Sequence, residues 1–361
     1  MRSTQWLRIV CTIIVVGMIF VAGVNYLIDP GYVYFKKKSG ISPDVYVQKL
    51  LTSEKGLVTE EWNERAVKTS LAKVNTEIDC IIVGSSHIMQ ISSLRNTGNI
   101  SKLCPVLLNL GVSGSSFEDL LIFSNIILEN KGKPKRVFIE INPWLFKFNM
   151  DSRYKMNQVQ YDSFLRKLND QTLLTSNSHY EFDLLKNLFN LEYFMISLKN
   201  YKSLFHQASI EEPKEKFLYE NGYTKAVTLQ DGSHVYDSHH IAKAKKTIKS
   251  IKNGGGDYKI NGNIYDDYAL ELFEKLILLY QRNEIEINFL ITPYHPSVFK
   301  NGPTKTTQHM QEIENVAQRL SIKHKVKLYG SFLPENIGCQ EDEFLDFMHA
   351  TSNCLDKIKF Y

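Results

Sequence analysis

The first apolar run of the chain is long enough to cross a membrane. Residues 7–28 are almost entirely apolar, and Arg8 is the one charged residue among them. A helix needs about twenty apolar residues to span a bilayer. Arg2 and Arg8 lie at the start, so we predict a single-pass membrane protein with a cytoplasmic N-terminus and an extracytoplasmic body. A cleaved signal peptide is the alternative, although the run exceeds the usual length of a signal core.

Beyond this run, short apolar stretches alternate with amphipathic ones. Apolar runs of strand length begin at Cys80, Pro105, Arg136, Ile285 and Lys325. Between several of them, residues 115–130, 268–283 and 307–322 place apolar side chains at helical spacing. Strands that alternate with helices predict an α/β fold, with a parallel sheet flanked by helices on both faces.

The same pattern divides the chain into three parts. We assign residues 1–28 to a membrane anchor, 29–75 to a stalk with a leading helix, and 76–361 to one large domain. Residues 148–263 interrupt the alternation, because they are rich in Tyr, Phe, Asn and Lys and contain the flexible stretch NGGGDYKINGN. We interpret them as an insertion over one edge of the sheet.

Composition excludes several classes of protein. Hydrophobic residues make up 43% and charged residues 23% of the chain, the balance of a globular protein rather than a disordered one. The net charge of +4 is small, and no zinc-finger or RNA-binding signature accompanies it, so we expect no nucleic-acid partner.

Four of the five cysteines lie beyond the anchor, where disulfides are permitted. Cys339 and Cys354 bracket one segment, so a bridge between them is one option, and Cys80 in its apolar strand is consistent with a buried thiol. No Cys-x-x-Cys pair suggests redox chemistry or zinc, so we interpret Cys80, Cys104, Cys339 and Cys354 as structural.

Small and polar residues gather where the predicted strands end. The stretches GSSH, GVSG, NPW and TPYHP follow four successive strands. The carboxyl ends of parallel strands share one edge of a sheet, and ligands bind in the crevice beyond that edge. The sequence therefore predicts a functional site there.

A serine, an aspartate and a histidine have the chain order of a hydrolase triad. Ser86 follows the first strand, whereas Asp346 and His349 stand three residues apart in DEFLDFMHATSNC and would share one face of a helical turn. A histidine held at one nitrogen by a carboxylate can take a hydroxyl proton at the other. Ser86 alone would suit a helix-capping hydroxyl, but the downstream pair favours a nucleophile.

The chain lacks the G-x-S-x-G motif of α/β-hydrolases. Its motifs instead resemble those of the SGNH, or GDSL-like, hydrolase superfamily. Gly84-Ser85-Ser86 matches the nucleophile turn, Gly114 in NLGVSGSS matches the glycine after the second strand, and DFMH matches the D-x-x-H block.

The resemblance implies a flavodoxin-like fold and a role for each matching residue. Ser86, rather than Ser85, would be the nucleophile, His349 the general base and Asp346 its partner. The backbone N–H groups of Ser86 and Gly114 would form the oxyanion hole.

The third block of the family departs from its usual pattern. The family usually has G-x-N-D after the third strand, and its Asn completes the oxyanion hole. Here the strand ends in IEINPW, so Asn142 is the nearest candidate, although it is out of frame. One missing donor costs about a hundredfold in rate.

A Gly-Ser-Ser turn with a weak third block, behind an anchor, looks like one branch of the superfamily. That branch holds exported acyl-transfer proteins that modify cell-surface polymers, such as the lipoteichoic-acid D-alanylation protein and alginate O-acetylation proteins. The resemblance implies a serine O-acyltransferase or carbohydrate esterase without a cofactor. Its partners would be an acylated donor, a polysaccharide or polymer acceptor, and a multi-span membrane acyltransferase. The alternative is a non-catalytic binding or assembly component of polymer export, which the weak third block would suit.

Other histidines receive lesser roles. We place His87 and His295 on the rim of the site, and His87 cannot be the base because neighbouring side chains diverge. The stretch DGSHVYDSHH contains Asp231, His234, Asp237, His239 and His240, which makes a metal-dependent hydrolase a third alternative. Its spacing is unlike that of a zinc site, so we expect a solvated loop and no metal.

Overall fold

The structure is a computed structural model. It describes residues 3–30, 33–34, 42–58, 63–74, 77–94, 99–130, 132–170, 184–199, 201, 210–213, 225–250, 263–300 and 302–361. Most of the stretch NGGGDYKINGN lies outside these ranges.

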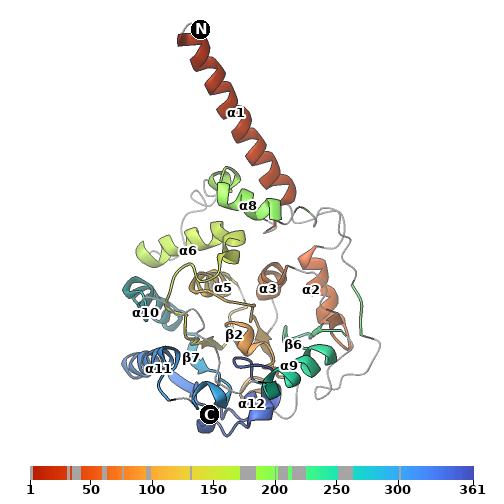
Figure 1. Cartoon of the computed structure of the whole chain (residues 1–361), viewed down its shortest axis with the longest axis vertical. Helices are drawn as coiled ribbons and strands as arrows, with labels where there is room; N and C mark the ends of the chain where they lie inside the picture. The colour runs from red at the N-terminus through yellow and green to blue at the C-terminus, as the bar shows by residue number, and fades with distance from the viewer. Residues whose placement is uncertain are drawn as a thin grey trace.

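The predicted parallel sheet is confirmed. Its five strands have the order β3-β2-β4-β7-β8, and every neighbouring pair is parallel. Figure 1 labels β2 and β7 of this sheet. Their bounds are β2 Cys80–Val83, β3 Leu107–Asn109, β4 Arg136–Glu140, β7 Glu286–Ile291 and β8 Lys327–Gly330. Each lies within an apolar run that the sequence analysis identified, because a strand covered on both faces needs apolar side chains on both.

One face of the sheet is covered by long helices. Ile81, Val137 and Phe289 point to this face and share its core cluster with side chains of the helices. These helices are α3 Glu64–Ala72, α5 Phe117–Glu129, α10 Asp267–Arg282 and α11 Lys305–His324. Helix α5 lies within the predicted helical stretch 115–130, and Ser116 caps it with a capping box to Asp119.

The other face has a thinner cover. Ile82, Phe138 and Leu290 point to it and pack against the segment after β2 and the C-terminal part of the chain. The helices there are short, namely α4 Ile100–Leu103 and α12 Ser352–Leu355, with the 3-10 turns η5 Pro334–Asn336 and η6 Glu341–Glu343 in the same part of the chain as α12. Little regular structure therefore holds this layer in place.

Both disulfides lie in the thin layer. Cys80 pairs with Cys104, and Cys339 pairs with Cys354, so Cys80 is buried but is not a free thiol. Cys11 in the anchor is free. Each bridge lowers the conformational entropy of the unfolded chain and so stabilises the folded state. The bridges thereby compensate for the apolar packing that long helices would supply.

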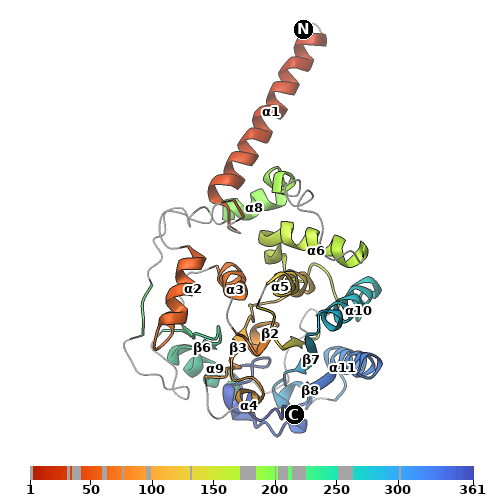
Figure 2. The same ribbon diagram turned by 180° about the vertical axis from the view of Figure 1, so that it is seen from behind.

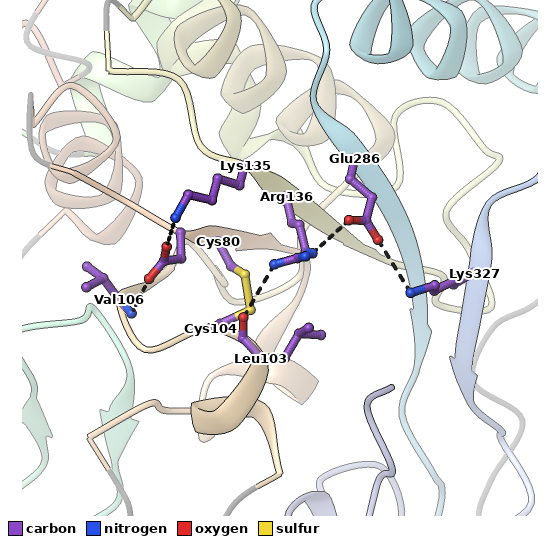
Figure 3. Close-up of a disulfide and its surroundings, with 9 residues drawn as sticks. Cys80, Leu103, Cys104, Val106, Lys135, Arg136, Glu286 and Lys327 are labelled. Carbon is purple, nitrogen blue, oxygen red and sulfur yellow. Dashed lines mark hydrogen bonds and ion pairs between the residues drawn. A yellow bond between two sulfur atoms is a disulfide. The ribbon is translucent and has the colours of Figure 1, made fainter.

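Charged side chains cross-link the amino ends of the strands, beside the first bridge. Arg136 donates to the Leu103 carbonyl at 3.4 Å and to Glu286 at 2.7 Å, while Lys327 lies 3.7 Å from the same Glu286 (Figure 3). These contacts join β4, β7 and β8 at the edge opposite the predicted site.

The expected stalk is partly packed against the domain. Helix α2 (Pro43–Thr52) places Tyr46, Val47 and Leu50 in the core, and strand β1 (Leu57–Val58) follows it. The residues between the anchor and the sheet are therefore not a solvated linker along their whole length.

The insertion at 148–263 is not confined to one edge. The turn η2 (Ser152–Asn157) and helix α6 (Gln158–Asp170) pack over α5, as a further layer of helices (Figures 1 and 2). Strand β5 (Val227–Thr228) pairs with β1 on one side and with β6 (His234–Val235) on the other, in a small antiparallel sheet. Its described part also includes helices α8 (Leu191–Lys199) and α9 (Ser238–Ser250).

Helix α1 (Ser3–Ile28) projects away from the rest of the molecule (Figures 1 and 2). Residues Thr4–Ile28 are long and apolar enough to cross a membrane by length and composition. The C-terminal end of α1 contacts α8, which lies across that end of the helix.

Removal of the first bridge should destabilise the thin layer. The double substitution Cys80→Ala and Cys104→Ala should lower the free energy of unfolding by about 2–4 kcal/mol, because the bridge closes a loop with a sequence separation of 24. Urea denaturation of the full chain in detergent measures this change. Cys11→Ala is the control and should leave the midpoint unchanged; an equal midpoint in the double variant would contradict the prediction.

Candidate active site

The site begins where β2 ends. Ser86–Ile88 form the short 3-10 helix η1, and Ser85 is its N-cap residue. The Ser85 hydroxyl accepts the His87 backbone N–H at 3.3 Å. Capping is therefore the role of Ser85, and Ser86 directs its hydroxyl toward the C-terminal part of the chain.

Three predicted residues form one hydrogen-bonded chain. Ser86 Oγ lies 2.8 Å from His349 Nε2, across a sequence separation of 263. His349 Nδ1 lies 2.9 and 2.8 Å from Asp346 Oδ1 and Oδ2. A carboxylate can only accept, so Nδ1 carries the ring proton and Nε2 is left to accept the proton of Ser86. This tautomer is the one that a general base requires.

The Asp346–His349 segment is a turn and not the helix that we expected. Asp346 Oδ1 accepts the backbone N–H groups of Met348 and His349 at 2.7 and 2.8 Å. A bridge between Phe344 and Ala350 closes the turn. The aspartate therefore fixes the backbone that carries the histidine, which spacing along a helix would not do.

Asp346 keeps its charge in this turn. Burial acts to raise its pKa, but the hydrogen bond and charge of His349, with the two backbone N–H groups, lower the pKa from 3.8 to about 2. The carboxylate is thus ionised at neutral pH and can stabilise a protonated His349.

A disulfide encloses this turn. Cys339 and Cys354 flank Asp346 and His349, and the bridge between them closes a segment with a sequence separation of 15. The aspartate and histidine are consequently held in a short loop of the thin layer.

A buried carboxylate supports the serine turn. Glu140, the last residue of β4, is 1% exposed. Its carboxylate accepts the Ser85 hydroxyl at 3.1 Å, the Thr292 hydroxyl at 3.3 Å and the Ser85 backbone N–H. Burial acts to raise the pKa of Glu140, but His87 and Ser85 outweigh it, so the pKa is lowered. Glu140 was not among the residues predicted from the sequence, although one charge inside the apolar run VFIEI was a signal for it.

Gly84 allows this carboxylate to lie so close to the turn. A Cβ at Gly84 would collide with the Glu140 side chain, at its Oε2 and Cβ atoms. The first residue of the Gly-Ser-Ser stretch is therefore required for packing.

His87 is buried and does not lie on an exposed rim, so that prediction was wrong. It is 2% exposed, and its Nδ1 lies 3.2 Å from Glu140 Oε1. Its ring centroid lies 5.0 Å from that of His349, 5.6 Å from Trp144 and 5.2 Å from Tyr294. It thus links the buried carboxylate to the ring of the candidate base.

The loop with Gly114 flanks the serine turn. Val112 N–H donates to the Gly84 carbonyl at 3.0 Å, and Gly114 has a φ of +58°, where glycine is favoured. Arg65 Nη2 donates to the Gly114 carbonyl at 3.4 Å. Among the described residues, neither the Ser86 nor the Gly114 backbone N–H has an acceptor. An oxyanion-hole donor must be free in this way before substrate binds.

Asn142 lies at the carboxyl end of the neighbouring strand, 1% exposed. Its Oδ1 accepts the Trp144 backbone N–H at 3.2 Å, which fixes the orientation of the amide and leaves Nδ2 as a donor. The Trp144 indole donates to the Ser115 carbonyl at 3.0 Å and so ties this turn to the Gly114 loop.

His295 also differs from the prediction, because it is 5% exposed and is not a rim residue. It caps the 3-10 turn η4 (Pro296–Val298) by accepting the Ser297 backbone N–H at 3.1 Å. Its own backbone N–H donates to the Phe347 carbonyl at 2.9 Å. It therefore helps to position the Asp346–His349 turn.

We expected the histidine-rich stretch DGSHVYDSHH to be a solvated loop, but part of it is buried. Asp231 is 5% exposed and accepts bonds from the Ser92 and Ser233 hydroxyls at 2.5 Å each. Tyr236 stacks on His240 with a centroid separation of 5.0 Å. Within the described ranges, no group of three His, Cys, Asp or Glu side chains is placed to hold a metal ion.

Comparisons with known proteins add no identification. No protein-family model matches the chain, and no curated protein matches its sequence.

The isosteric change Glu140→Gln should lower the free energy of unfolding by about 2–4 kcal/mol. The glutamine side chain would replace one carboxylate oxygen with an NH2 group, which would then face the Ser85 or Thr292 groups that now donate to the carboxylate. Glu286→Gln is a matched control at an exposed strand end, where the ion pairs contribute about 0–1 kcal/mol. Urea denaturation compares the two, and equal losses would argue against a special role for the buried carboxylate.

Proposed function

We propose that the protein is a membrane-anchored, extracytoplasmic serine O-acyltransferase or esterase of the SGNH type, acting on acyl esters of a cell-surface polysaccharide or polymer. The observation that carries the proposal is the hydrogen-bonded chain from Ser86 through His349 to Asp346. A nucleophile, its base and the group that orients the base are the minimum for covalent acyl transfer.

The topology of the sheet supports this assignment. Numbered along the chain, the order β3-β2-β4-β7-β8 is the 2-1-3-4-5 order of flavodoxin-like sheets. Its switch point lies between β2 and β4, where ligands bind in such sheets. Ser86 follows β2 and Asn142 follows β4, so the nucleophile and a candidate oxyanion donor flank that point.

The residues divide the reaction as follows. Ser86 Oγ attacks the acyl carbonyl carbon while His349 Nε2 takes its proton, and the carbonyl oxygen becomes the oxyanion of a tetrahedral intermediate. The Ser86 and Gly114 N–H groups and Asn142 Nδ2 stabilise that charge. His349 returns the proton to the leaving oxygen as the ester bond breaks. A sugar hydroxyl or water then attacks the acyl-enzyme, again with His349 as the base, and Ser86 is regenerated.

The resemblance adds the biological setting. It favours transfer to a polymer over hydrolysis and suggests a multi-span membrane acyltransferase as the donor-side partner. The bias of Arg2 and Arg8 favours a cytoplasmic N-terminus. In that orientation the disulfides form in an oxidising compartment.

Two adjacent serines provide a direct test. Full-length protein in detergent should react with a fluorophosphonate probe and hydrolyse a small acetyl ester. Ser86→Ala and His349→Ala should abolish labelling and lower turnover by at least about a thousandfold. Ser85→Ala removes the neighbouring hydroxyl, which caps η1 and donates to Glu140, but leaves the Ser86 hydroxyl in place, so this variant should still be labelled. Labelling that depended on Ser85, or wild-type protein that neither reacted nor turned over, would instead favour a non-catalytic binding component.

Asp346 should contribute no ionisation to the acid limb of the pH profile. Its folded pKa lies below its usual value, so the stability that its carboxylate contributes is present above the unfolded pKa and is lost only as the pH falls toward 2. A plot of log kcat/KM against pH should therefore show no break from this carboxyl above about pH 4. A slope of two on the acid limb in that range would mean that Asp346 titrates there together with a second group.

A further inference from the structure

Helix α8 has the reverse polarity of a helix on a water-exposed surface. Its buried residues include Tyr193 and Ser197, which carry hydroxyls. Its exposed residues include Leu191, Met195 and Leu198, at 67%, 54% and 41% exposure. These three are spaced four and three residues apart, so they form one face of the helix.

The buried hydroxyls bind polar groups at the C-terminal end of α1. Asn25 is fully buried, donates to the carbonyls of Leu188 and Asn190 at 2.9 and 3.1 Å, and accepts the Ser197 hydroxyl at 3.2 Å. Tyr193 donates to Asp29, also fully buried, at 2.8 Å. A polar residue near the end of a membrane span must find partners within the protein, and the segment around α8 supplies them.

The apolar surface is continuous from α1 to α8. Phe194 of α8 meets Phe20 of α1 with ring centroids 5.9 Å apart. Phe20 is itself 62% exposed, and neighbouring apolar residues along α1 are also exposed. Figures 1 and 2 show that α8 lies on the side of the body from which α1 projects.

The dimensions of α1 place α8 at the membrane boundary. Trp6 and Tyr26 are exposed near the two ends of the helix, and aromatic residues favour the interfaces of a bilayer. They are twenty residues apart, which in a helix is about 30 Å, the thickness of the hydrocarbon layer. Phe20 lies one to two turns inside Tyr26, so α8 lies at the level of the outer interface.

We propose that the exposed face of α8, formed by Leu191, Met195 and Leu198, is a second membrane-binding element that lies in the lipid interface beside α1. Lipid contact explains the reversed polarity, because the apolar side chains then face an apolar medium and the hydroxyls face the protein. Two contacts on different elements fix the tilt of the body relative to the bilayer, which a single helix would not do. This role goes beyond the proposed acyl transfer and depends only on α1 spanning the membrane.

Spin labels on the full chain in lipid nanodiscs test the proposal. In a Cys11→Ser background with both disulfides intact, a nitroxide is attached at Met195→Cys. Its collision rates with oxygen, which enters lipid, and with a water-soluble nickel chelate are then measured. Ile322→Cys is the matched control, because Ile322 is an apolar residue with 81% exposure and belongs to α11, a helix that lies far from α1 in Figure 1. Ile14→Cys, in the middle of α1, reports on the span itself.

The expected result is an oxygen-to-nickel ratio at Met195 that is severalfold above the ratio at Ile322 and below that at Ile14, because the ratio rises with depth in the bilayer and α8 lies at the interface. Labels at Leu191→Cys and Leu198→Cys should give ratios similar to that at Met195→Cys. Agreement among the three variants shows that the result does not come from one variant with a distorted structure. Nickel collisions at Met195 equal to those at Ile322 would overturn the proposal, since α8 would lie in water. Shielding from both reagents would also overturn it, because protein rather than lipid would cover this face. A nickel-accessible Ile14 would remove its premise.

Discussion

The candidate site depends on one buried carboxylate. Glu140 has no access to water, so its charge is stable only where donors fill its acceptor positions. Ser85 and Thr292 supply those donors, and His87 lies against the same oxygen atom as they do. Because Ser85 is committed to this carboxylate and to the cap of η1, the next residue is the one whose hydroxyl reaches His349. The choice between two adjacent serines thus follows from a residue on a different strand.

The other half of the site depends on covalent and local restraints. Asp346 and His349 belong to the thin layer, where short helices and turns replace the long helices of the opposite face. A disulfide, a β-bridge and the bonds from Asp346 to its own backbone hold the turn. The proposed nucleophile is therefore positioned by the sheet and the proposed base by a cross-linked loop, and the two meet at one edge of the sheet.

The sequence predicted the features that depend on local pattern. Apolar runs identified the five strands of the sheet, and short motifs identified Ser86, Asp346 and His349, which the structure brings together. The errors concern burial that distant residues decide. His87 and His295 look like loop histidines beside a strand end, yet neighbours from other elements cover both. Glu140 was missed for the same reason, since nothing adjacent to it in the chain shows which donors surround it.

The long separation between Ser86 and His349 has a consequence for biosynthesis. In the proposed orientation the chain is exported from its N-terminal side, so Ser86 leaves the cytoplasm 263 residues ahead of its base. Until the segment between Cys339 and Cys354 has crossed, Ser86 lacks the histidine to which it is bonded in the folded chain. Under the proposed mechanism a half-translocated molecule would therefore be inert toward acyl esters. Reactivity would begin only when export of the body is nearly complete, which would confine the proposed chemistry to the far side of the membrane.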